Sequence, residues 1–211
     1  MNKIMKTILL SARSLVFAAA ILLAVGSTAA FAQPGSQTTP QTFNEFVQAG
    51  QESARKADYA GAARWYSKAL EVRPDLEIMY ARGASYMGQA KWDEALKDFN
   101  AIVKARPDSV PGLYMRAVCY NAKTNWKKGL VDAEAVLKLD AEHADAYQTR
   151  GLAKAGLGRY AEAEADLAEA IRRNPRNPMY FTVRAAIYTD QGKAALAQAD
   201  KLKAEQLKGA Q

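Results

Sequence analysis

The stretch KWDEALKDFNAIVKARPD, residues 91–108, contains a residue pattern that recurs along this chain. An aromatic residue opens the pattern, alanine follows three positions later, and proline closes it. The same order is found in ADYAGAARWYSKALEVRPD (57–75) and in GRYAEAEADLAEAIRRNPRN (158–177). Internal similarity at a fixed spacing is the signature of a repeat architecture, in which each repeat is one supersecondary unit. The length of the repeat therefore indicates the fold.

The period is 34 residues. Trp92, Trp126 and Tyr160 are 34 positions apart, and Tyr59 lies 33 positions before Trp92. Two further series follow the period, namely the tyrosines Tyr86, Tyr120 and Tyr188 and the unit-closing prolines Pro74, Pro107 and Pro175, in which the first interval is again 33. Three positions depart from the pattern: Lys154 replaces a tyrosine, Gly129 an alanine, and Ala141 a proline. Two of these departures fall in the third unit, which we expect to pack more loosely.

These residue types at this period resemble the tetratricopeptide repeat (TPR) family. The resemblance implies about five units of two antiparallel helices, stacked into an all-α, right-handed superhelical solenoid over residues 43–207. The expected units are approximately 43–75, 76–109, 110–143, 144–177 and 178–207, followed by a tail at 208–211. Small residues near the middle of the first helix, at Gly50, Gly83, Ala117 and Gly151, would let the two helices of a unit approach closely.

Two series of charged residues follow the same period. One consists of the arginines Arg82, Arg116, Arg150 and Arg184, and the other of the aspartates Asp98, Asp132, Asp166 and Asp200. The first unit has Ala49 and Trp65 at these positions and so lacks both partners together. Because a buried charge without its partner costs several kcal/mol, this joint absence predicts one inter-helical ion pair in each of the other four units. The alternative is a ladder of arginines that binds an anionic ligand.

Residues 1–32 have the layout of a secretory signal peptide. Three basic residues, Lys3, Lys6 and Arg13, precede the apolar run from Leu15 to Val25, and Ala30-Phe31-Ala32 forms a small-residue cleavage site. The alternative is an uncleaved membrane anchor, but a spanning helix needs about 20 apolar residues, and the run from Leu15 to Val25 is shorter than that. We therefore predict cleavage after Ala32 and export to the periplasm, without membrane attachment afterwards. Residues 33–42, QPGSQTTPQT, have nothing apolar to bury and are expected to form a flexible linker.

The composition is that of an ordinary globular protein, and the charge disfavours a nucleic-acid partner. Hydrophobic residues make up 49% of the chain and charged residues 24%, as in ordinary globular proteins. Removing residues 1–32 takes away three of the 29 basic residues and no acidic one, which lowers the formal net charge from +7 to +4. With this modest charge and no long basic run, we expect no nucleic-acid partner.

The sequence contains no recognisable catalytic motif. Metalloprotease, serine-hydrolase, Walker-type and dinucleotide-binding signatures are all absent. The single cysteine, Cys119, is expected to be a buried apolar thiol, and the single histidine, His143, a solvated loop residue. A nucleophilic pair of the two is the alternative. We therefore predict a protein that is not an enzyme and holds no cofactor or metal.

A stacked TPR array would present a concave surface formed by the first helix of each unit. The TPR positions that usually face inward place seven residues on this surface: Tyr80, Met87, Tyr114, Val118, Asn121, Gln148 and Leu152. Tyr80 and Tyr114 occupy equivalent positions in adjacent units and could form a two-ring platform for a peptide or a helix. The alternative is that these side chains pack between units.

The sequence thus predicts a non-catalytic TPR scaffold or adaptor that binds a protein or peptide partner in the periplasm or cell envelope. One alternative is an accessory subunit that positions a substrate for a separate envelope enzyme. Another is a self-associating scaffold, because the end units expose unstacked faces.

Overall fold

The computed structural model describes residues 42–209, and its regular elements over this range are all α-helices. The predicted signal peptide, most of the predicted linker and the last two residues of the tail lie outside the described range. The ten helices are α2 (Phe43–Arg55), α3 (Tyr59–Val72), α4 (Leu76–Gly88), α5 (Trp92–Ala105), α6 (Val110–Ala122), α7 (Trp126–Leu139), α8 (Ala144–Gly156), α9 (Tyr160–Arg173), α10 (Pro178–Asp190) and α11 (Ala194–Gly209). None of these helices is long and apolar enough to cross a membrane.

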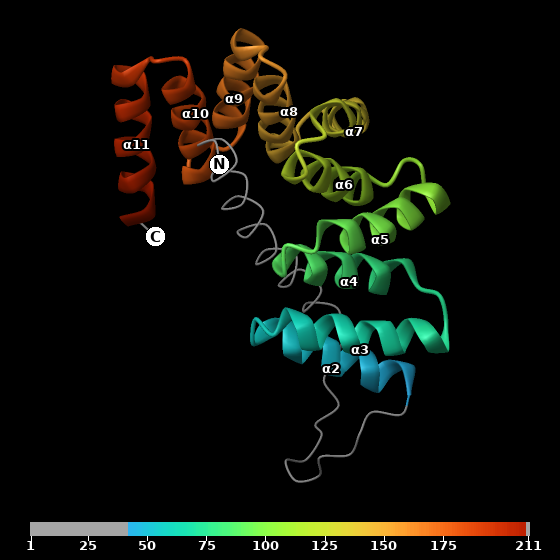
Figure 1. The fold of residues 1–211 in the computed structure, drawn as a ribbon. Coiled ribbons are helices and arrows are strands. Elements are labelled where there is room, and N and C mark those ends of the chain that lie inside the picture. Colours follow the sequence, from blue (N-terminus) through green and yellow to red (C-terminus); the bar gives the residue numbers. More distant parts are fainter. Residues whose placement is uncertain (1–41, 210–211) are drawn as a thin grey trace. The chain divides into compact units, whose positions relative to one another are not determined.

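The helices fall into two compact parts, one ending at Ala105 and the other beginning at Arg106. In the first part, α2 packs on α3, α3 on α4 and α4 on α5. In the second part, every helix from α6 to α11 packs on the next (Figure 1). In addition, α6 touches α8 and α8 touches α10, so the first helices of successive units lie against one another. Each part is therefore built from helix pairs that bury their apolar faces on their neighbours.

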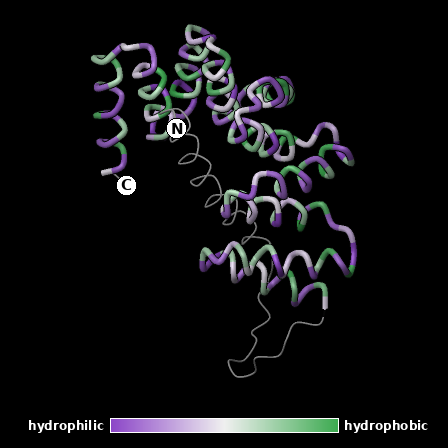
Figure 2. The backbone as a smooth tube through the Cα atoms, viewed as in Figure 1, coloured by the Kyte–Doolittle hydropathy of each residue, from purple (hydrophilic) through white to green (hydrophobic). Residues whose placement is uncertain are grey.

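Hydrophilic and hydrophobic residues alternate along each helix (Figure 2), as expected for helices that are half covered. In the first part, Tyr66 of α3 packs with Ile78 of α4 in one apolar cluster. In the second part, Leu167 of α9 packs with Val183 and Ile187 of α10 in another. Both clusters join the second helix of one unit to the first helix of the next. The core is therefore a series of small clusters repeated along the array.

Side-chain caps define where most of the helices begin. Thr42 and Glu45 form a reciprocal capping box at the start of α2. Five further helices have a simpler cap, in which the side chain of the N-cap residue accepts a backbone N–H; these residues are Asp58, Asp75, Ser109, His143 and Asn177. The His143 cap corrects the expectation of a solvated loop histidine: the ring is half-buried, and its Nδ1 accepts from the Ala146 N–H at 3.2 Å. Side-chain caps therefore mark the starts of six of the ten described helices, whereas Asn125 and Arg159, at the starts of α7 and α9, make no side-chain cap bond.

The turn inside each helix pair has one residue in the left-handed backbone region, always at the same repeat position. These residues are Ala57, Ala90, Thr124, Gly158 and Gly192, with φ between 56° and 78°. Only glycine adopts this region without steric cost. Three of the five turns therefore keep a left-handed backbone although their sequence disfavours it, because the two packed helices dictate the geometry of the turn.

The small residues that were predicted at the helix crossings lie at close contacts. A Cβ atom added to Gly83 would come within 2.8 Å of the Phe99 ring, and one added to Gly50 would come within 2.5 Å of Tyr66. In the third unit, Ala117 and Ala133 occupy the positions of Gly83 and Phe99, and both are buried. The larger residue on one helix is thus accompanied by a smaller one on the facing helix, which keeps the crossing filled.

Candidate protein-binding surface

The four predicted arginine–aspartate pairs come together in the structure. Each arginine donates from Nε and from Nη2 to the two carboxylate oxygens of its aspartate, at distances between 2.6 and 3.0 Å. The aspartate side chains are nearly buried, whereas the arginines keep about a fifth of their surface exposed. Such a bidentate fork requires arginine and explains why lysine never replaces it in this series.

These pairs satisfy themselves and leave little for a ligand. The hydrogen bond to Asp132 raises the pKa of Arg116, and Asp98, Asp166 and Asp200 raise the pKa of their arginines for the same reason. Arg82 also donates from Nη1 to Ser67 Oγ at 3.1 Å, which connects α4 to α3 of the preceding unit. The arginines therefore hold helices together, which favours the ion-pair interpretation over the anion-binding ladder.

The first unit fills the corresponding place with an aromatic contact. Trp65 stands where the other units have aspartate, and its ring stacks on Phe46 at a centroid distance of 6.2 Å. Ala49 stands where they have arginine. The first unit therefore buries no unpaired charge at this place, as the joint absence of the arginine and the aspartate from its sequence indicates.

Most of the predicted groove residues are buried. Each of the following six side chains is at most 7% exposed: Met87, Tyr114, Val118, Asn121, Gln148 and Leu152. In the second part this follows from the direct packing of α6 on α8 and of α8 on α10. Leu152, for example, belongs to the apolar cluster that contains Val183 and Ile187. The structure therefore places these six residues in the interior, as in the alternative that they pack between helices, and not on a surface that a partner could reach.

Tyr80 is the exception among the seven, because it is half-buried. Its ring meets the Phe99 ring edge-on at 5.9 Å, and burial raises its pKa to about 12. Tyr114, its predicted counterpart, is buried against the His143 ring at 4.9 Å. A platform of two exposed tyrosine rings is therefore not what the structure presents.

The described residues hold no group of histidine, cysteine, aspartate and glutamate side chains that could bind a metal ion. Cys119 is fully buried, and this burial raises the pKa of its thiol. A protonated, inaccessible thiol is a poor nucleophile. The structure thus gives Cys119 the packing role that the sequence predicts.

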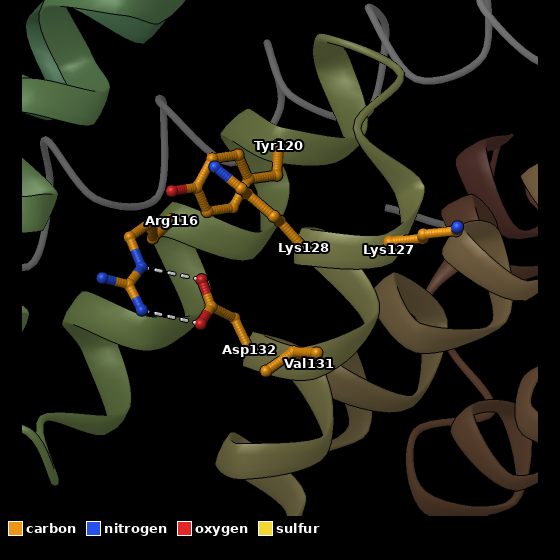
Figure 3. Close-up of a pocket in the computed structure, with 6 residues that line it drawn as sticks. All are labelled: Arg116, Tyr120, Lys127, Lys128, Val131 and Asp132. Atoms are coloured by element: carbon orange, nitrogen blue, oxygen red, sulfur yellow. Dashed lines mark hydrogen bonds and ion pairs between the residues drawn. The ribbon is translucent and has the colours of Figure 1, made fainter.

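A hollow of about 310 Å³ lies on the second part, between α6 and α7. Figure 3 shows the six residues that line it: Arg116, Tyr120, Lys127, Lys128, Val131 and Asp132. Arg116 and Asp132 are paired with each other. The ammonium group of Lys128 lies 5.4 Å from the centre of the Tyr120 ring, within reach of a cation–π contact. Sequence reasoning missed this site, although the adjacent lysines 127 and 128 at the start of a helix were visible as a signal.

Comparisons with known proteins agree with this architecture. Two models of the tetratricopeptide repeat match residues 80–147 and 118–188, which together span just over half of the chain. The chain belongs to the tetratricopeptide repeat family. No curated protein matches the chain by sequence.

Solved structures share this fold at low sequence identity. MamA 41-end from Desulfovibrio magneticus RS-1 is 19% identical, with a TM-score of 0.69 over 82% of this chain and 99% of that one. TTC0263, a thermophilic TPR protein in Thermus thermophilus, is 21% identical, with a TM-score of 0.69 over 79% and 91%. Another crystal structure of MamA is 21% identical, with a TM-score of 0.63 over 76% and 95%. The predicted all-α fold of stacked helix pairs is confirmed.

Within this TPR array, the third unit differs from the others at Gly129. A Cβ atom at Gly129 would come within 2.1 Å of Asn121 Oδ1, so the Asn121 side chain occupies space that alanine fills in other units. Asn121 is 1% exposed, and its Nδ2 donates to the Thr149 carbonyl at 2.9 Å. The off-pattern glycine thus makes room for a buried amide that connects α6 to α8.

The fourth TPR unit differs at Lys154, which stands in the tyrosine series. Its side chain is only 10% exposed, and its Nζ lies 2.8 Å from Asp166 Oδ2. Asp166 therefore has two cationic partners, Arg150 and Lys154. The break in the tyrosine series was the signal for this contact, but the sequence did not show which carboxylate the lysine would reach.

Proposed function

We propose that this TPR protein is a non-catalytic scaffold that mediates protein–protein interaction in the periplasm or cell envelope. The observation that carries the proposal is the array of stacked helix pairs that matches the TPR family. TPR folds support protein-interaction scaffolds because stacked units expose a long surface without requiring a cavity for chemistry. The burial of Cys119 and the pairing of the repeat aspartates with arginines are consistent with a role in binding.

The location in this proposal rests on residues 1–32. A basic start, an apolar run and a small-residue site before Gln33 support export by a cleavable signal. The test is to express the full chain with a C-terminal tag in a bacterial host and to fractionate the cells. We expect a periplasmic protein whose intact mass corresponds to a chain that begins at Gln33. Retention of residues 1–32, or recovery from the cytoplasm alone, would overturn the location.

The interaction itself is tested by affinity capture. Residues 33–211, tagged at the C-terminus, serve as bait in a periplasmic extract, with the same bait after thermal unfolding as the control. We expect at least one protein that is bound by the folded bait, absent from the control, and able to bind again as a purified protein at a defined stoichiometry. If no such protein is found, and sedimentation velocity shows one monomeric species at every concentration, the scaffold proposal fails.

A further inference from the structure

The hollow between α6 and α7 combines an apolar wall with cationic groups. Tyr120 and Val131 line it, and the Val131 side chain is unusually open for an aliphatic residue, at 63% exposure. Figure 3 shows Lys128 reaching toward the Tyr120 ring, whereas Lys127 extends away from the ring. The charges of Arg116 and Asp132 cancel in their bidentate pair. The net charge around the hollow therefore comes from the two lysines.

These lysines have no carboxylate partner in the part of the chain that the structure describes. No ion pair within 4.0 Å involves Lys127 or Lys128, and both side chains are exposed. Among the described lysines, Lys56, Lys154, Lys193 and Lys208 pair with a glutamate or aspartate, whereas Lys127 and Lys128, like Lys138, do not. The ammonium groups of Lys127 and Lys128 are therefore available to an anionic partner.

The position of the two lysines also disfavours a role in folding. They lie in the first turn of α7, where the positive end of the helix dipole repels a cation. The N-cap residue Asn125 provides no side-chain hydrogen bond to compensate. The second unit has Asp93 and Glu94 at the equivalent positions, which suit a helix start. The pair of lysines is thus confined to one unit, at some cost to its helix, beside the hollow.

We propose that the α6–α7 hollow binds an acidic peptide segment of a partner protein. Carboxylates of the segment meet Lys128 and, at the rim, Lys127, while an apolar side chain between them packs on Tyr120 and Val131. Charge complementarity selects the occupant, because one ammonium group beside an aromatic ring and a second at the rim suit carboxylates next to an aliphatic residue. The inference rests on the proposed scaffold function and assigns that function a docking site and a chemical class of partner.

The experiment measures binding of a fluorescent peptide, acetyl-Glu-Leu-Glu-Glu-Leu-amide, to residues 33–211 by anisotropy. The variant Lys127→Asp/Lys128→Glu copies the Asp-Glu pair of the second unit. We expect it to weaken binding by roughly tenfold or more. We also expect it to raise the thermal midpoint by about 1–3 °C, because the helix dipole is now complemented. Opposite effects on binding and stability separate a lost site from misfolding.

Single changes refine the assignment. Lys128→Gln should weaken binding more than Lys127→Gln, because Lys128 is the lysine beside Tyr120. Lys138→Gln is the matched control: it removes the same charge from the exposed surface of α7 but does not line the hollow. A peptide with glutamine for glutamate should not bind the native chain.

Several results would overturn the proposal. Unchanged peptide affinity in the double variant, or an equal loss in Lys138→Gln, would mean that the hollow is not the site. Tighter, lysine-dependent binding to vesicles of phosphatidylglycerol than to the peptide would assign the lysines to a lipid surface instead. A captured partner that the double variant still holds with native affinity would contradict the docking site alone and leave the scaffold function standing.

Discussion

At the scale of single residues, the repeat arginines and aspartates act as matched pairs. Each aspartate is buried enough to need a cation, and each receives two parallel N–H···O bonds from an arginine 16 positions earlier. Desolvation makes a lone buried carboxylate costly, whereas removing both partners removes the cost as well. The first unit illustrates the second case, since Ala49 and Trp65 leave no charge behind.

This reasoning predicts a strong coupling between Arg116 and Asp132. Arg116→Leu alone should lower the free energy of unfolding by about 3 kcal/mol, because the Asp132 carboxylate then remains buried without the guanidinium group that pairs with it. Arg116→Leu combined with Asp132→Leu should recover much of that loss. Denaturant unfolding of the native chain, both single variants and the double variant measures the coupling energy. If the double variant loses as much as the two single variants together, the pair does not act as a unit.

At the scale of elements, the helix pairs dictate the turns that join them. The left-handed position recurs in all five turns, although Ala57, Ala90 and Thr124 are not glycine. Thr124 is the least suited of the three, because its branched Cβ crowds the backbone in this region. The packing of α6 on α7 thus overrides the local preference of the turn residue.

We therefore expect Thr124→Gly to stabilise the protein by about 1 kcal/mol, since relief of backbone strain exceeds the added flexibility of the unfolded chain. The reciprocal change, Gly158→Thr, should destabilise by a similar amount. A Cβ atom at Gly158 would meet nothing within 4 Å, so only the backbone is tested. Thermal unfolding followed by circular dichroism gives both values. A destabilised Thr124→Gly variant would show that the threonine side chain stabilises the turn.

At the scale of the whole molecule, stability depends on tyrosine and cysteine side chains that both parts bury in their protonated, uncharged form. Burial raises the pKa of Tyr66 and Tyr80 to about 12, and it also raises the pKa of Tyr180 and of the Cys119 thiol. In the unfolded chain a tyrosine titrates near its ordinary pKa of about 10. Above that pH the folded state holds protons that the unfolded state has released, so stability falls as pH rises.

The expected result is a decline in the thermal midpoint that begins above about pH 8.5, where the Cys119 thiol of the unfolded chain ionises, and steepens between about pH 10 and pH 12 as the tyrosines of the unfolded chain follow. Tyr66 contributes up to about 2 kcal/mol of this loss. Tyr66→Phe should therefore flatten the alkaline decline, and Tyr59→Phe, the same change at the start of the same helix α3, serves as its control. Thermal unfolding at constant ionic strength across this range is the measurement. Ionisation of Tyr66 itself near pH 10, in a chain that stays folded, would contradict its burial.

The sequence by itself determined the period of 34, the helix pairs and the partners of the repeat charges. These features are local: the pattern repeats within one unit, and Arg82 reaches Asp98 across a single turn. The small residues at the helix crossings could be predicted for the same reason, since Gly83 and Phe99 belong to one helix pair. The end of the tail and the predicted signal peptide lie outside the described residues, so those expectations remain predictions.

Only the tertiary structure decided which side chains stay accessible. Tyr114, Asn121 and Leu152 occupy positions that the repeat pattern assigns to an open groove, yet packing among α6, α8 and α10 buries them. The hollow beside Lys128 and the contact of Lys154 with Asp166 likewise depend on how neighbouring helices meet. A periodic sequence specifies which face of each helix is apolar, but the distance and angle between successive units decide how much of the remaining surface is covered.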